Sequence, residues 1–192
     1  MRQGDEIFHS WYAPESDHGS GPGSTIEATG GFRVYLEDFI RDHEIKSILD
    51  YGCGDFIWMR HVDLHGATYL GVDIVSSLIE RLGVYPHHDF IVIDPETYNI
   101  PCVDLILCKD VLQHLPNNEI RSLIAKMQAK AKYVLFVNDG PKGDEPCNVD
   151  IDRGGWRRID LHGFGVSGRV VFDLVGAPDA KIAFLWSSAK DS

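Results

Sequence analysis

The chain has 192 residues, 44% of them hydrophobic, and a formal charge of −11 from 18 basic and 29 acidic residues. This length and composition predict a single globular domain spanning residues 1–192, with an ordinary hydrophobic core. An acidic chain without a run of Lys or Arg argues against a long nucleic-acid partner, because phosphate backbones bind clusters of positive charge. A single nucleotide or a capped RNA end is still compatible with this charge balance.

The N-terminal residues 1–20 lack the basic and apolar regions of a signal peptide. No apolar run approaches the roughly 20 residues that a membrane-spanning helix needs. The four cysteines include no C-x-x-C pair, so reduced cysteines are a simpler interpretation than disulfides or a zinc site. We therefore expect a cytoplasmic protein with no membrane partner and no metal, and the sequence leaves its oligomeric state open.

A segment rich in glycine and serine, residues 16–29, runs directly into a helical pattern near residues 29–43. Thr25 or Thr29 can cap this helix. Glycine content alone would favour a flexible arm. The direct entry into a helix favours an ordered segment instead, so we expect residues 1–28 to form an arm or lid.

Beyond residue 46, short apolar runs alternate with helical segments. Strands are predicted at residues 47–51, 68–72, 90–93, 103–108, 132–137, 169–175 and 181–186, with helices through 77–82 and after a cap at Asn117 or Asn118. Apolar strands alternating with helices are typical of a parallel sheet covered on both faces. The connection at residues 176–180 has the length of a hairpin. The predicted fold is a Rossmann-like seven-stranded α/β sheet, mostly parallel, with helices on both faces and an antiparallel C-terminal hairpin.

The ends of the first two strands carry the signature of a nucleoside site. Gly52 and Gly54 follow the first strand, where glycine lets the backbone turn tightly and approach a ligand. Asp73 ends the second strand, roughly 20 residues later, where a carboxylate can accept the ribose hydroxyls or begin a helix. No third glycine follows in the segment up to Leu64, so pyrophosphate binding is disfavoured. An NAD-dependent oxidoreductase is therefore only an alternative.

The ordered runs ILDYGCGDF, YLGVDI, FIVIDPE and CVDLILCKDVLQHL resemble the motifs of class I S-adenosylmethionine (SAM)-dependent methyltransferases over residues 30–140. The resemblance implies SAM as cofactor and a small-molecule methyl acceptor. The SAM contacts that it implies are Asp50, Gly52, Cys53, Gly54 and Asp55 beside the methionine part, Asp73 and Ile74 at the ribose, Asp94 at the adenine, and Cys108 and Lys109 through their backbone. Asp55-Phe56 departs from the family's usual small residue and glycine, so a catalytically silent SAM-binding subunit is an alternative.

The string from SGPGSTIEAT through CGDFIWM is similar to a narrower bacterial group of methyltransferases linked to polysaccharide or small-molecule biosynthesis. In that group the Gly/Ser arm forms part of the site. The resemblance implies that Ser24, Thr25 and Arg33 bind the methionine carboxylate. A guanidinium pairs bidentately with a carboxylate, although a solvated helix residue is an equally good interpretation of Arg33.

The catalytic candidates lie beyond the fourth strand. Asp110 and His114 have the i, i+4 spacing that places two side chains on one face of a helix. An imidazole that titrates near neutrality can take a proton from a hydroxyl acceptor. The alternative is that His114 only packs at the Leu115-Pro116 turn.

The substrate candidates lie in loops at the strand ends, which commonly carry specificity. They are Trp11, Tyr12, Asp139, Asn148, Trp156 and Arg157. Trp156 with its flanking arginines can stack on a ring and hold an anionic group. The predicted function is methyl transfer from SAM to a small acceptor, a hydroxyl of a sugar or related metabolite. Methylation of an amine, or of a nucleotide or RNA cap end, is the alternative.

Overall fold

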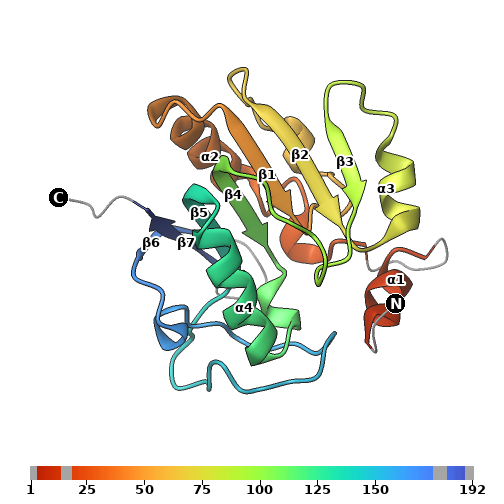
Figure 1. The fold of residues 1–192 in the computed structure, drawn as a ribbon. Coiled ribbons are helices and arrows are strands. Elements are labelled where there is room, and N and C mark those ends of the chain that lie inside the picture. The colour runs from red at the N-terminus through yellow and green to blue at the C-terminus, as the bar shows by residue number, and fades with distance from the viewer. Residues whose placement is uncertain (1–3, 14–18, 175–180, 189–192) are drawn as a thin grey trace.

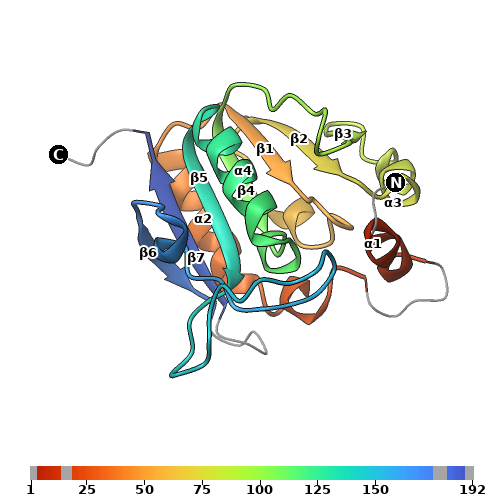
Figure 2. The same ribbon diagram turned by 60° about the horizontal axis from the view of Figure 1, so that its bottom comes forward.

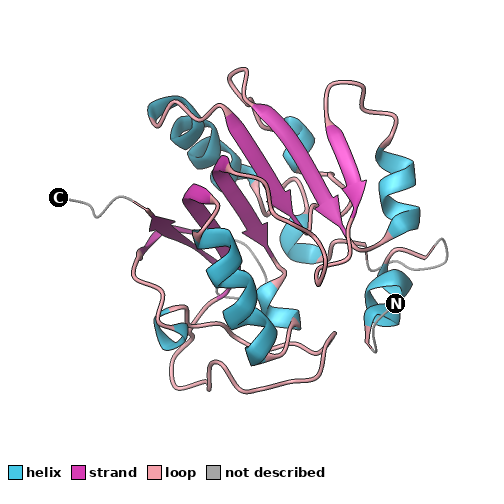
Figure 3. Ribbon diagram, viewed as in Figure 1, coloured by secondary structure: helices cyan, strands magenta, loops and turns pink. Residues whose placement is uncertain are grey.

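The computed structural model describes residues 4–13, 19–174 and 181–188. One seven-stranded sheet organises these residues in the order β3-β2-β1-β4-β5-β7-β6 (Figures 1 and 3). The strands are β1 (Ser47–Tyr51), β2 (Thr68–Asp73), β3 (Asp89–Val92), β4 (Val103–Lys109), β5 (Ala131–Asp139), β6 (Arg169–Asp173) and β7 (Lys181–Ser187). The first five strands pair in parallel, and β7 is antiparallel to both β5 and β6.

Helices cover both faces of this sheet. They are α1 (Asp5–Trp11), α2 (Gly30–Asp42), α3 (Ser76–Leu82) and α4 (Asn117–Gln128). α2 and α3 pack on one face and α4 packs on the other (Figures 1 and 2). The predicted fold class is therefore confirmed. Among the described residues, no helix has the length and apolar character needed to span a membrane.

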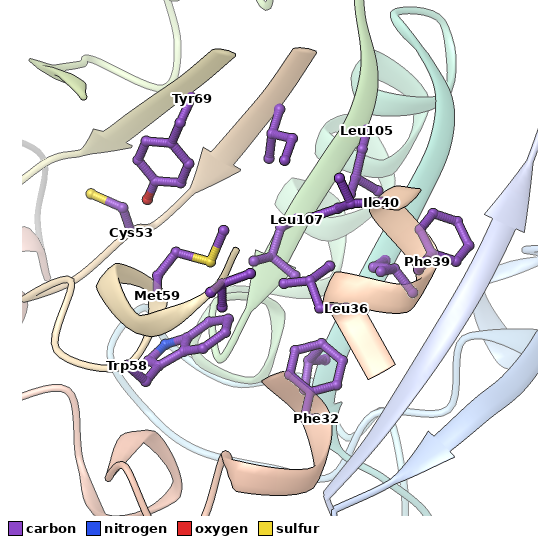
Figure 4. Close-up of a cluster of buried hydrophobic side chains, with 14 of the residues drawn as sticks. Phe32, Leu36, Phe39, Ile40, Cys53, Trp58, Met59, Tyr69, Leu105 and Leu107 are labelled. Atoms are coloured by element: carbon purple, nitrogen blue, oxygen red, sulfur yellow. The ribbon is translucent and has the colours of Figure 1, made fainter. Parts of the chain in front are cut away.

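The central strands are buried on both sides, which explains their continuous apolar sequences. In β4, Leu105 and Leu107 join the core under α2, whereas Ile106 and Cys108 join the core under α4. Figure 4 shows the α2 side chains, including Leu36, lying against those of Leu105 and Leu107. Successive side chains of a strand point to opposite faces, so both faces need an apolar cover.

The structure corrects several local expectations. α1 was not predicted, and α4 has Pro116 rather than an asparagine at its N-cap. The side-chain amide of Asn117 instead donates to the Asn148 backbone carbonyl (2.9 Å). Thr29 does occupy the N-cap of α2, but its hydroxyl donates to the Thr25 carbonyl (2.8 Å). The predicted turn at residues 176–180 lies outside the described residues.

Phe56 explains how the chain departs from a glycine-rich first turn. Its φ is +58°, in the left-handed region that normally favours glycine. Its ring is 1% exposed and packs among Tyr69, Tyr85 and Phe90, with ring centroids 5.0–5.3 Å away. Burial of the ring thus offsets the backbone strain, and the side chain points into the core.

This balance between strain and burial predicts that the Phe56→Gly variant is at least as stable as Phe56→Ala. An ordinary helical position gives the opposite order of stability. Phe56→Ala should lower the free energy of unfolding by about 3–5 kcal/mol, as is usual for a buried phenylalanine. Phe56→Gly should cost no more, because glycine relieves about 1 kcal/mol of left-handed strain. Urea unfolding would measure both variants. At the helical control position Phe39, the glycine variant should be the less stable by about 1 kcal/mol, and the same order at Phe56 would contradict the prediction.

Candidate functional site

A cavity of about 600 Å³ opens at the carboxyl ends of the parallel strands. The turn after β1, the end of β2 and the segment after β4 form its base. α1 and residues 19–24 line it from the N-terminal side, and Asp139, Arg153, Trp156 and Lys181 line it from the C-terminal half. Figure 2 shows α1 beside the strand ends. Ligands of open α/β sheets bind at this edge.

Two glycines make the turn after β1 possible. Gly52 and Gly54 have φ values of +79° and +57°. A Cβ at Gly52 would lie 2.3 Å from Val111 Cγ2, and one at Gly54 would lie 2.5 Å from Ser20 Oγ. Ser20 Oγ also accepts a hydrogen bond from the Asp55 amide (3.1 Å) and shares one with the Tyr12 hydroxyl (2.9 Å). The N-terminal arm is thus joined directly to the glycine turn.

Two carboxylates stand beside this turn. Asp73 accepts hydrogen bonds from the Gly54 and Val75 amides (3.1 Å each), so it fixes both the turn and the start of α3. Asp50 accepts from the Tyr69 hydroxyl (2.7 Å). Burial raises the pKa of Asp73, and it raises that of Asp50 to about 7. Val75 and not Asp73 is the N-cap of α3, and Asp73 also lines the cavity.

A buried cluster of charges connects β4, β5 and β7. Lys181 forms ion pairs with Asp110 and with Asp139, the second at 2.8 Å. Lys109 pairs with Asp110 and donates to Ser24 Oγ (2.8 Å). The two lysines are only 4–5% exposed. Two ammonium groups and two carboxylates thus neutralise one another beside the cavity.

This cluster removes Asp110 from the candidate bases. Burial alone would raise its pKa, but the ammonium groups of Lys109 and Lys181 outweigh burial and lower it to about 2. The predicted helical face shared with His114 is also wrong. Asp110 has a left-handed φ of +58°, and only Leu112–His114 form a single 3₁₀ turn. Asp110 is therefore an ion-pair partner with little basicity.

His114 retains the geometry of a general base. Its Nδ1 lies 2.7 Å from the Gly155 carbonyl oxygen, which can only accept a hydrogen bond. The proton is therefore on Nδ1, and Nε2 carries the basic lone pair, which faces the Gln113 side-chain amide at 3.4 Å. The ring packs edge-on against Trp11 at 5.0 Å between centroids. Burial lowers its pKa, so the imidazole is neutral at pH 7.

The structure brings most of the predicted site residues into one cavity. Those that line it are Trp11, Tyr12, Ser24, Asp50, Gly52, Cys53, Gly54, Asp73, Ile74, Lys109, Asp110, His114, Asp139 and Trp156. Those that lie outside its lining are Thr25, Arg33, Asp55, Asp94, Cys108, Asn148 and Arg157. The polar groups of this second set mostly stabilise the fold.

Thr25 and Arg33 stabilise the turn before α2. Thr25 Oγ1 accepts a hydrogen bond from the Ala28 amide (3.1 Å). Arg33 Nη2 donates to the Ile26 carbonyl (3.3 Å). Of the three residues expected to bind the methionine carboxylate, Ser24 lines the cavity, whereas Thr25 and Arg33 lie outside its lining.

Three further residues predicted at the SAM site, Asp55, Asp94 and Cys108, lie outside the cavity lining. Asp55 Oδ1 accepts from the Ile57 amide (3.2 Å), and Asp94 Oδ1 accepts from the Glu96 amide (3.0 Å). Each carboxylate thus closes its own turn. The Cys108 side chain is fully buried in the core under α4.

Asn148 and Arg157 brace the loop after β5. The Asn148 amide exchanges two hydrogen bonds with the Asp160 backbone (2.8 and 3.0 Å). Arg157 Nη2 donates to the Leu115 carbonyl (2.6 Å) and to Asn117 Oδ1 (2.8 Å). These contacts join the loop to Leu115 and Asn117, and neither Asn148 nor Arg157 lines the cavity.

Sequence reasoning missed several lining residues, among them Phe8, Trp58, Arg153 and Lys181. Phe8 and Trp11 stand three residues apart behind an acidic first turn, and this spacing was a usable helix signal. Lys181 opens a predicted strand. Nothing local marks it, because its two partners come from β4 and β5.

Comparison with known proteins places this geometry in a family. Residues 32–153, more than half of the chain, match the family model described as a methyltransferase domain. A ubiquinone biosynthesis O-methyltransferase of Nitrosomonas europaea is 20% identical over 149 residues, which cover 71% of this chain. The chain spans 61% of the length of that relative.

Two solved structures share the fold at low identity. The magnesium protoporphyrin IX methyltransferase of Synechocystis PCC 6803, solved with bound S-adenosylhomocysteine (SAH), has a TM-score of 0.64 at 16% identity, over 97% of this chain and 94% of its own. The N-terminal domain of EvdMO1, solved in the presence of SAH and D-fucose, has a TM-score of 0.61 at 13% identity, over 98% of each chain. With the family match over the strands that build the cavity, these findings show that the chain belongs to the methyltransferase-domain family.

Proposed function

We propose that this protein transfers a methyl group from SAM to a hydroxyl of a small acceptor, a sugar or related metabolite. One observation carries the proposal. A single cavity is lined both by the glycine turn with Asp73 and by the His114 imidazole, whose Nε2 is the basic nitrogen. A methyltransferase-domain protein needs these two functions, cofactor binding and acceptor activation, within one space.

The residues at the β1 and β2 ends fit SAM. The positive φ values of Gly52 and Gly54 let the backbone turn tightly at the base of the cavity, which both residues line. Asp73 presents a carboxylate for the ribose hydroxyls, and Asp50 lines the cavity beside the glycine turn. The cavity is also within the usual 300–1,000 Å³ of small-molecule sites. When bound, SAM supplies an electrophilic methyl group on its sulfonium.

Relatives support the same cofactor and an oxygen acceptor. Both structural neighbours were solved with SAH, and one of them in the presence of the sugar D-fucose. The curated relative is an O-methyltransferase. These proteins act on different acceptors, so the sugar is inferred from the cavity walls, where aromatic side chains line the space.

His114 would take the proton from the acceptor hydroxyl. The hydrogen bond from Nδ1 to the Gly155 carbonyl holds the ring orientation and directs Nε2 to accept. The side-chain nitrogen of Gln113 lies 3.4 Å from His114 Nε2. Gln113 Oε1 accepts a hydrogen bond from the Asp139 backbone amide (2.9 Å). Positioning in line with the methyl group supplies the rest of the acceleration.

The first test is calorimetric titration with SAH, with NADH as the control ligand. SAH should bind in the micromolar range and NADH should not. Asp73→Asn should weaken SAH binding at least tenfold, since one carboxylate oxygen is replaced by an amide. Glu80→Gln, on the exposed side of α3, should leave it unchanged. Tight NADH binding, or no loss in the Asp73 variant, would overturn the proposed cofactor site.

His114→Asn tests the base while keeping an N–H donor for the Gly155 carbonyl. Turnover should fall about 100-fold, the lower range for a general base, with SAH affinity unchanged. In the wild type, kcat/KM should rise with pH through a pKa below 6.5, because burial lowers the pKa of His114 and only the neutral ring accepts a proton. The His114→Asn variant should lose this rise of kcat/KM with pH. A pH profile identical to that of the wild type would exclude His114 as the general base.

A further inference from the structure

The part of the cavity around His114, called the acceptor end below, has aromatic walls. Phe8 and Trp11 enter it from α1, and Trp156 enters it from the loop after β5. The Trp156 indole donates to Asp139 Oδ2 (2.7 Å), and this bond fixes its orientation. At 47% exposed, it also keeps a large free surface. Rigid rings of this kind stack on flat apolar faces of a ligand.

Lys109 and Lys181, the two lysines at this end, are both paired with carboxylates. Lys181 contacts both Asp110 and Asp139, and Lys109 contacts Asp110. All four groups lie beside one another in the buried cluster. An anionic ligand would have to displace a carboxylate that is already in place.

Arg153 is compensated in the same way. Its guanidinium pairs with Asp5 of α1 (3.2 Å) and with Glu119 of α4, and its side chain is only 7% exposed. The arginine thus joins α1 to α4 and meets two carboxylates. The other basic lining residue in the described part of the chain, Lys126, donates to the Pro95 carbonyl (3.3 Å), beyond the end of β3.

The arginines that flank Trp156 in sequence do not face the cavity. Arg157 is buried in the loop, where its Nη2 meets Leu115 and Asn117. Arg158 Nε donates to Glu145 Oε2 (2.5 Å), and its guanidinium lies 5.4 Å from the Trp156 ring centre. The expected anion-holding role of these arginines is therefore not available at the acceptor end.

We propose that the acceptor is a ring compound that carries a hydroxyl but no phosphate or carboxylate group. The aromatic walls select the ring. Compensated charges reject the anion, because it would lose its hydration without gaining an unpaired cation. This inference rests on the proposed methyltransferase function, and it disfavours nucleotide, nucleotide-sugar and RNA cap acceptors.

Matched pairs of ligands test the proposal on the full-length protein. One pair is a methyl hexoside and its phosphate ester, and the other is a catechol-type alcohol and the corresponding carboxylate. Binding to SAH-saturated protein is measured by calorimetry, and transfer of label from SAM is measured in parallel. The neutral member of at least one pair should bind and react at least tenfold better. The two pairs also distinguish a sugar ring from an aromatic ring.

Variants locate the selectivity in the cavity. Glu119→Gln removes one of the two carboxylates at Arg153, so the anionic member should gain at least threefold relative to the neutral one. Glu145→Gln alters the partner of Arg158 outside the cavity and should leave the ratio unchanged. Trp156→Leu should weaken the neutral ring about tenfold, as loss of a stacking contact commonly does.

The inference is overturned if an anionic member binds or reacts as well as its neutral partner, or if no neutral ring compound binds. It is also overturned if both glutamate variants shift the ratio equally. Absence of SAH binding in the first titration would instead overturn the proposed function, and the two failures are therefore distinguishable.

Discussion

Mutual neutralisation of two buried lysines, the buried Asp139 and the half-buried Asp110 holds the strand ends beside the cavity together. Lys109 ends β4 and Asp110 directly follows it, Asp139 ends β5, and Lys181 begins β7. A single one of these charges would be costly in so buried a place, and removing one partner typically costs about 3–5 kcal/mol. The strand ends are consequently held in a fixed arrangement.

The cavity takes its shape from that arrangement. Through Ser24 the cluster reaches the N-terminal arm, and through Asp139 it orients the Trp156 indole. The antiparallel entry of β7 matters here, because it places the first residue of β7 beside the last residue of β5. A parallel strand at that position would have its carboxyl end beside Asp139. Lys181, the first residue of the strand, would then lie at the opposite edge of the sheet.

The fold was predictable because its determinants are local. Apolar strands buried on both faces, such as Val103–Lys109, and the amphipathic face of α2 are visible in short windows of sequence. The turn residues Gly52, Gly54 and Asp73 were also predictable, since their role depends on following a strand. The prediction of Asn117 or Asn118 as the N-cap of α4 was wrong, because Pro116, directly before the helix, occupies the N-cap position.

The rest of the site depends on contacts between distant segments, which spacing does not encode. Arg33, Asn148 and Arg157 carry the right chemistry for ligands, yet each donates to a backbone carbonyl and lies outside the cavity lining. Lys181 carries no local signal, yet it compensates two catalytic-edge carboxylates. Charge type alone therefore does not identify a binding residue. A basic side chain attracts an anion only when the fold leaves it unpaired, and at the acceptor end of this cavity the described lysines and arginines all have carboxylate partners.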